Sequence, residues 1–258
     1  MSNPEYDIFV DRKIYPDAAE IFATSLQSIE NIKNQCLFVI DTNALLLPYT
    51  ITKESINEIK RVYQILVDDK RLFIPGQVAR EFAKNRPEKI KELFQKIIRK
   101  RDNMRQFSSG KYELLKDISE YKEILDLEKK IDELMQDYSK KIGIVGDHIK
   151  EWEWNDPVSK AYSDLFAAEA IFDPIYNEQE IQEKLKFRYV HKIPPGYKDG
   201  GKPDDGIGDL LIWQTILDLA KKEKKDVIFI TGEEKADWYY KSEGQILYPR
   251  YELITEFA

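Results

Sequence analysis

The chain has 258 residues, of which 42% are hydrophobic and 34% charged, and its formal net charge is −7 at pH 7. This length suits one large domain or a core domain with an insertion, and the net charge excludes nucleic-acid binding by bulk charge, so such binding would require a local basic face. A single cysteine, Cys36, and two histidines exclude an internal disulfide and any metal site that is rich in cysteine or histidine.

The first predicted elements are a helix at about residues 16–34 and a buried strand at residues 37–40. Leu37-Phe38-Val39-Ile40 is a short run of branched and aromatic residues, which is typical of a buried parallel strand. Asp41 follows it directly. Ligands of open α/β sheets bind beyond the carboxyl ends of the strands, so Asp41 is placed to meet solvent and substrate. Its alternative role is to cap the next helix.

The second strand repeats this pattern. Residues 53–67 carry apolar side chains at helical spacing, and Leu72-Phe73-Ile74-Pro75 is typical of a short strand. Glu81 lies in the first turns of the helix that follows, so we expect it near the same sheet edge as Asp41. The alternative is that Glu81 only stabilises the helix N-terminus, by about 0.3–1 kcal/mol.

Residues 85–189 have a different pattern, which predicts a long helical insertion. Two amphipathic segments separated by a polar break at residues 108–110 indicate an αα-hairpin, whose second helix should end at residues 143–146. Between Lys84 and Arg105, nine basic residues stand against three acidic ones. Such a run is either a solvated helix face or an arm that contacts phosphates. The candidates for nucleic-acid contact are Lys84, Arg86, Arg99, Lys100 and Arg101.

The C-terminal part returns to strands and acidic residues. Residues 194–206 are rich in proline and glycine and predict a long loop, after which Asp209 stands at the start of a helix, where it is also a candidate N-cap. Residues 227–231 predict another buried strand, with Glu233 and Asp237 following it. A short strand at residues 246–248 and a helix at residues 251–257 end the chain.

Acidic residues that follow strands or open helices should meet at one edge of the sheet. Parallel strands joined by right-handed crossovers have their carboxyl ends on the same side. Clustered carboxylates repel one another unless a cation neutralises them, and ligands that are all oxygen suit Mg²⁺ or Mn²⁺. Such a site can activate a water and stabilise charge on a phosphodiester. The predicted set comprises Asp41, Glu81, Asp209, and Glu233 or Asp237 as ligands, with Thr42, Asn43 and Thr231 positioning ligands or phosphate oxygens.

These motifs resemble the PIN-like domain family, in particular its subset with a large helical insertion. The resemblance implies an α/β fold with a Rossmann-like parallel sheet flanked by helices. It implies a single domain with its core at residues 36–84 and 190–258, and a nuclease centre that uses Mg²⁺ or Mn²⁺. The matching segments span nearly the whole chain in the expected order: Asp41-Thr42-Asn43, Pro75 to Phe82, Pro194 to Asp199, Gly208 to Trp213, and Phe229 to Glu233 leading to Lys235 and Asp237-Trp238.

By position, Asp41, Glu81 and Asp209 match the acidic ligands of the family, and Asn43 matches a polar residue that shapes its site. The helical insertion matches no part of the common core.

The fourth acidic position departs from the family pattern. The family usually has Asp where this chain has Glu233, which is longer by one methylene. Glu234 and Asp237 are alternatives for this position, and Asp205 in the preceding loop is a further candidate.

The resemblance implies a divalent-metal-dependent nuclease, with RNA as the favoured substrate and DNA as the alternative. Many members of the family cleave RNA as toxins or in RNA processing, and some act in defence against phage. A homodimer and an antitoxin or other regulatory protein are the expected kinds of partner. No apolar run is long enough to span a bilayer and the N-terminus is not signal-like, so we expect a cytoplasmic protein with no membrane partner.

Two other functions fit parts of the sequence. Glu233 at the fourth position is compatible with a catalytically weak PIN-like scaffold that binds RNA or a protein through the insertion. A phosphatase of the haloacid dehalogenase type also has an Asp at the end of its first strand. That chemistry needs a second Asp two residues later, where this chain has Asn43.

Overall fold

The computed structural model describes residues 6–23, 27–103, 110, 112–202 and 204–258. The chain divides into two compact units. Residues 1–84 and 161–258 form the first, which we call the α/β unit, and residues 85–160 form the second, which we call the helical arm.

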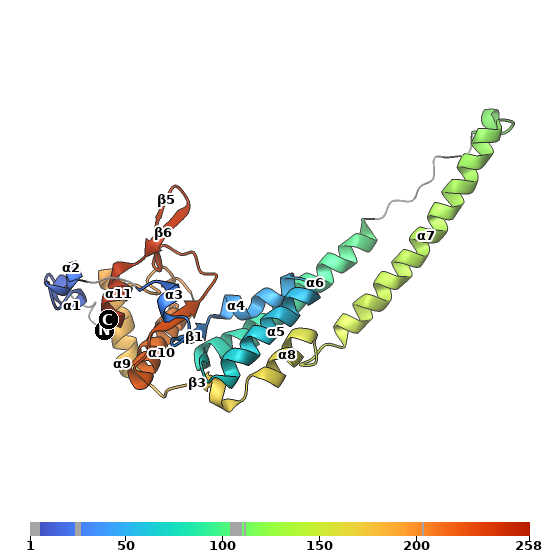
Figure 1. Ribbon diagram of the computed structural model, residues 1–258. Helices are drawn as coiled ribbons and strands as arrows, with labels where there is room; N and C mark the ends of the chain where they lie inside the picture. Colours follow the sequence, from blue (N-terminus) through green and yellow to red (C-terminus); the bar gives the residue numbers. More distant parts are fainter. Residues whose placement is uncertain (1–5, 24–26, 104–109, 111, 203) are drawn as a thin grey trace. The chain divides into compact units, whose positions relative to one another are not determined.

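A parallel sheet forms the core of the α/β unit (Figure 1). In the described part of the chain it has four strands in the order β3-β2-β1-β4. Strands β1 and β4 are paired along their whole length, with Ile40 opposite Ile230, so Asp41 and Thr231 leave the sheet side by side. This arrangement confirms the expected α/β fold. The strands are β1 (Leu37–Ile40), β2 (Leu72–Pro75), β3 (Ile171–Phe172) and β4 (Val227–Ile230).

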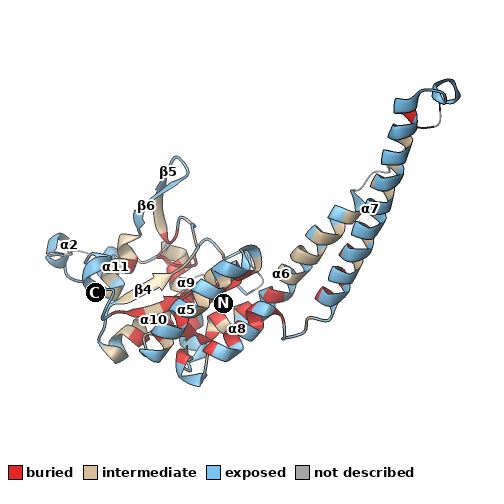
Figure 2. Cartoon of the chain, turned by 45° about the vertical axis from the view of Figure 1, so that its right-hand side comes forward, coloured by how far each residue is buried: buried red, intermediate tan, exposed pale blue. Residues whose placement is uncertain are grey.

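Apolar side chains of the inner strands and of the surrounding helices make the core of this unit. Figure 2 colours the buried residues red. Helix α10 (Ile207–Glu223) contacts β2, and its residues Leu210 and Ile216 are almost fully buried. Burying each such side chain stabilises the fold by about 1.5–3 kcal/mol. The core therefore fixes the strand ends on which the acidic residues stand. Further helices of this unit are α4 (Thr42–Leu46), α5 (Lys53–Asp68), α9 (Glu178–His191) and α11 (Tyr251–Phe257).

The N-terminal segment differs from the single helix expected at residues 16–34. It contains three short helices, α1 (Asp11–Ile14), α2 (Glu20–Ala23) and α3 (Ile29–Ile32), and residues 24–26 lie outside the described part. Ser28 is extended, with φ −68° and ψ 148°, which is incompatible with a helix running through it. Phe22 is 93% exposed, so the apolar spacing does not mark a buried face here.

The strand expected near the C-terminus belongs to a separate antiparallel hairpin. Strand β6 (Gln245–Pro249) pairs with β5 (Tyr239–Ser242), which the sequence pattern did not predict. The terminal helix, α11, has the expected bounds.

The helical arm contains most of α6 (Gly76–Asp102) and all of α7 (Ser119–Lys150), which run side by side in Figures 1 and 2. Helix α6 contains both Glu81 and the basic run at residues 84–102. The helix predicted after the second strand and the first helix predicted for the insertion are therefore one continuous helix. Helix α7 continues through residues 143–146, where we expected it to end. A Cβ at Gly146 would lie 3.2 Å from Ile98 Cδ1, so this glycine allows α6 and α7 to approach closely. Although both helices are long, no helix in the described part is long and apolar enough to cross a membrane.

The end of the insertion lies earlier in the structure than the sequence pattern placed it. The arm ends at residue 160, within α8 (Pro157–Leu165), whereas we expected about residue 189. Strand β3 pairs with β2, and Ile181 and Leu185 of α9 pack with Leu210 of α10. These long-range contacts bring residues 161–189 into the α/β unit.

Candidate metal centre

Asp41 is held by both of its carboxylate oxygens where β1 ends. It is the N-cap of α4, and its Oδ1 accepts a hydrogen bond of 2.7 Å from the backbone N–H of Thr42. Its Oδ2 accepts one of 2.6 Å from the hydroxyl of Thr231, which is 190 residues away in the sequence. The capping role and the placement at the sheet edge, which were alternatives in the sequence, are thus both present.

Glu81 connects the end of β1 with the start of α10. Thr42 Oγ1 donates a 2.7 Å hydrogen bond to Glu81 Oε2, and Gln77 Nε2 donates one of 2.9 Å to Oε1. A Cβ added to Gly208 would lie 2.4 Å from Glu81 Oε1, so the carboxylate lies directly against the first turn of α10. Asp209 is the next residue of that turn. A side chain at position 208 would displace the Glu81 carboxylate from this place.

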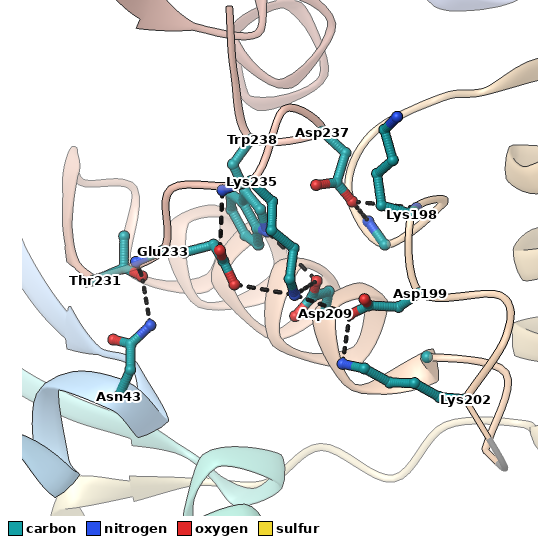
Figure 3. A network of polar contacts seen from close by, with 12 residues as sticks. Asn43, Lys198, Asp199, Lys202, Asp209, Thr231, Glu233, Lys235, Asp237 and Trp238 are labelled. Atoms are coloured by element: carbon teal, nitrogen blue, oxygen red, sulfur yellow. Dashed lines mark hydrogen bonds and ion pairs between the residues drawn. The ribbon is translucent and has the colours of Figure 1, made fainter. Parts of the chain in front are cut away.

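Asn43 ties the start of α4 to the segment after β4 (Figure 3). Its Oδ1 accepts a 2.7 Å hydrogen bond from the backbone N–H of Gly232, and its Nδ2 lies 3.4 Å from Thr231 Oγ1. Both ends of the amide are thereby engaged. An amide in this role cannot supply the acid–base group that the phosphatase alternative requires.

A lysine ammonium lies among the remaining acidic residues. Lys235 Nζ lies between three carboxylates (Figure 3). It is 2.9 Å from Asp199 Oδ2, 3.5 Å from Asp209 Oδ2 and 3.0 Å from Glu233 Oε2. The other oxygen of Glu233, Oε1, accepts hydrogen bonds from the backbone N–H groups of Glu234 and Lys235. Glu233 is therefore fixed by its own loop as well as by the ammonium.

Burial and nearby charge shift the pKa values on this side of the site in opposite directions. Burial raises the pKa of Asp209 to about 6, against the opposing effect of the Lys235 charge. Burial also acts to raise the pKa of Asp199. Hydrogen bonds from Lys202 and Lys235 outweigh it, and the pKa of Asp199 is lowered. Asp209 therefore holds a proton more tightly than Asp199 does.

The Asp41 side of the site carries negative charge without a basic partner. Burial raises the pKa of Asp41, while hydrogen bonds from Thr231 and Thr42 lower it and the charges of Glu81 and Glu233 raise it further. Among the described residues, neither Asp41 nor Glu81 forms an ion pair with a lysine, arginine or histidine.

The three alternatives to Glu233 at the fourth acidic position lie elsewhere. Asp237 is fully buried, and its Oδ2 accepts hydrogen bonds from the backbone N–H groups of Gly196, at 2.9 Å, and Lys198. Its Oδ1 has no hydrogen-bond partner among the described residues. Glu234 and Asp205 are exposed, and Glu234 lies 3.8 Å from Lys241. Of the four, Glu233 alone joins the Lys235 ion pairs among the described residues.

Arg86 is not available for the nucleic-acid contact that we expected of it. Its guanidinium is buried within the helical arm, 2.6 Å from Asp156 Oδ2 and 2.7 Å from Ser159 Oγ, and it lies over the ring of Trp154. The pattern of basic residues could not reveal this, because Asp156 is 70 residues away. The other expected contacts remain accessible: Lys84, Arg99 and Lys100 are exposed, and Arg101 is half-buried beside Asp102.

Sequence reasoning missed three residues that shape the centre. Lys235 and Asp199 were quoted only as parts of matching segments, and Gln77 was not singled out. Lys235 had a signal, since it lies two residues after Glu233 in a segment rich in charge. Asp199 had none, because its position depends on how the loop at residues 194–206 folds.

The donor set suits a hard divalent cation. As they lie, the described residues include no group of three or more acidic, histidine or cysteine side chains arranged to hold a metal ion. The ligands available at the sheet edge are nevertheless all oxygen atoms, which Mg²⁺ and Mn²⁺ prefer. The Lys235 ammonium shows that three of the carboxylates already attract a cation.

Comparison with known families agrees with this architecture. A family model described as a PIN-like domain matches residues 37–253, from the start of β1 into α11. No curated protein and no solved structure matches the chain. The matched range includes every residue of the centre described above.

Proposed function

The chain belongs to the PIN-like domain family, whose members are generally nucleases, and from this we propose that it is a divalent-metal-dependent nuclease acting on phosphodiester bonds, with RNA as the favoured substrate. One observation carries the proposal. Asp41 and Glu81 are joined through Thr42, and Glu81 lies against Gly208 beside Asp209, so acidic residues from three parts of the sequence meet at one sheet edge.

Each residue of the centre has a distinct part in this proposal. Asp41, Glu81 and Asp209 would hold Mg²⁺ or Mn²⁺, with Glu233 beside them. A bound ion would activate a water and stabilise the charge that develops on the phosphodiester. Thr42 and Thr231 orient the carboxylates by donating hydrogen bonds to them. Because Asp237 bonds the backbone at Gly196, we assign it to positioning the loop at residues 194–198.

Nucleic acid would be bound in part by exposed basic residues of α6. Lys84, Arg99 and Lys100 are free to approach phosphates, and an acidic protein needs such a local basic face. The family supports wider settings as well, namely RNA processing, toxin action or defence against phage. In these settings a homodimer, an antitoxin or another regulatory protein would be the partner, and the cytoplasm would be the compartment.

Cleavage assays test the proposal directly. End-labelled single-stranded RNA, single-stranded DNA and a branched duplex are incubated with Mn²⁺, Mg²⁺ or EDTA and with wild type, Asp41→Asn or Asp209→Asn. Cleavage should require the metal and fall at least about 1000-fold in both variants, because losing a ligand costs several kcal/mol of transition-state stabilisation. Asp226→Asn is the matched control, since Asp226 is exposed and precedes the opposite end of β4.

A metal-independent activity, or one unchanged by Asp41→Asn, would contradict the proposal. The engagement of Glu233 by Lys235 favours a second candidate, a catalytically weak scaffold that binds RNA or a protein partner. Tight binding of single-stranded RNA with no metal-dependent turnover in a pure preparation would support the scaffold instead.

A further inference from the structure

Lys235 joins three segments of the α/β unit through its ammonium. Asp199 belongs to the loop before α10, Asp209 to the first turn of α10, and Glu233 to the segment after β4 (Figure 3). Their carboxylates are largely buried, with side-chain exposures of 11%, 20% and 20%. A single positive charge is thus set among three negative ones, where water screens the attraction only partly.

The other half of the centre is built differently. Within the described part of the chain, the hydrogen bonds to Asp41 and Glu81 come from neutral groups: the hydroxyls of Thr42 and Thr231, the backbone of Thr42 and the amide of Gln77. No ammonium or guanidinium pairs with either carboxylate in the described part of the chain. One half of the acidic edge therefore has a built-in cation, and the other half does not.

We propose that the Lys235 ammonium takes the place of a second cation, so that the centre binds one divalent ion, at the end formed by Asp41 and Glu81. Asp209 borders both positions, because its Oδ2 contacts Lys235 and the preceding Gly208 lies against Glu81, so it can serve as a ligand of this ion as well. This inference rests on the proposed function, because it assumes that the acidic edge binds Mg²⁺ or Mn²⁺. A divalent ion among Asp199, Asp209 and Glu233 would be repelled by the ammonium and would have to displace it from all three carboxylates. Lys235 is thus a positioning residue that sets the number of ions and their location.

A purely structural ion pair makes a different prediction from this one. If Lys235 only held three segments together, its removal would lower stability without changing how many ions bind. If Lys235 replaces a second metal ion, its removal should create a second binding position for a divalent ion. The stoichiometry of metal binding separates the two roles without any measurement of activity.

The test is to titrate the full chain with Mn²⁺ and to measure the number of bound ions. Calorimetry and the loss of the free-ion signal in electron paramagnetic resonance each report this number. Wild type should bind one ion, and Lys235→Met should bind two. Lys235→Arg keeps the charge and should bind one. The matched control is Lys241→Met, because Lys241 pairs only loosely with the exposed Glu234.

A second variant guards against failure of Lys235→Met to fold. Lys235→Met combined with Asp199→Asn removes one charge of each sign, so the cluster keeps its wild-type net charge while the ammonium is gone. This protein should also bind a second ion. Two ions in wild type, or one ion in both Lys235→Met proteins, would overturn the inference and leave the nuclease proposal intact. No ion in wild type would overturn both.

Discussion

The α/β unit and the helical arm hold their charged side chains in contrasting ways. At the metal centre, polar contacts join residues that are distant in sequence, such as Asp41 with Thr231 and Thr42 with Glu81. In the arm, most ion pairs lie within one turn of a helix and are exposed. Exposed examples are Lys91 with Glu88, Lys116 with Glu113, and Lys150 with Asp147.

This difference between the two units indicates which charged residues depend on the tertiary structure for their position. Exposed pairs one turn apart contribute about 0.2–0.5 kcal/mol each, so they can change without changing the structure. The carboxylates of the metal centre, in contrast, come from separate segments, and they reach their positions only when the sheet has formed. Among the arm's described residues, the buried pair of Arg86 and Asp156 is the exception. The predictions below test this contrast, beginning with that exception.

Arg86→Leu should destabilise the protein by about 3–5 kcal/mol. The substitution removes the guanidinium that neutralises the fully buried Asp156 carboxylate, and breaking a buried pair on one side is costly. The measurement is urea unfolding followed by circular dichroism.

Arg99→Leu is the matched control, because Arg99 is an exposed arginine of the same helix. Its effect should stay within about 0.5 kcal/mol. Equal losses in the two variants would show that the buried pair is no exception and that the contrast between the units is wrong.

Asp209 should make the metal-free protein less stable as the pH rises. Its pKa is about 6 when folded, above the ordinary value, so the folded state holds this proton more tightly than the unfolded state. The resulting stabilisation is complete below about pH 4 and is lost as the pH passes 6. It amounts to at most about 2–3 kcal/mol. The measurement is the stability difference between wild type and Asp209→Asn from pH 4 to 7 with EDTA present.

The exposed Asp226→Asn serves as the reference for this experiment. Wild type and Asp226→Asn should share one pH dependence, from which Asp209→Asn departs. If all three curves run parallel, Asp209 titrates as an ordinary carboxyl and the centre is less buried than the structure indicates.

Arg99→Gln with Lys100→Gln should have the smallest effect. Each lost phosphate contact lowers the slope of log binding constant against log salt concentration by about 1. The affinity for nucleic acid should fall about 3- to 10-fold, and the stability of the protein should not change. Binding of labelled single-stranded RNA between 50 and about 200 mM salt measures both quantities. An unchanged slope would mean that this run is only a solvated helix face.

The fold class and much of the centre could be predicted because they depend on local patterns. Short runs of branched residues locate β1, β2 and β4 almost to the residue, an acidic residue stands shortly after each run, and Asp209 opens α10. Because the strands are parallel, the residues that follow them come together at one edge of the sheet. Asp41, Glu81 and Asp209 could be placed together on this basis.

Other features depend on partners far away in the chain, and local pattern therefore misled us. Glycines at residues 143–146 suggest a helix end, yet Gly146 allows close contact with α6. Arg86 looks like its basic neighbours until Asp156 folds against it.

The sequence by itself determined the α/β class, the strands β1, β2 and β4 and the acidic residues near their ends, since each follows from hydrophobic periodicity and composition over a few residues. Tertiary folding alone placed Lys235 among Asp199, Asp209 and Glu233, and left Asp41 and Glu81 without a basic partner in the described part of the chain. The reason is physical: the position of an ammonium on a flexible stem is set by the carboxylates that surround it, and these come from segments that meet only in the folded chain.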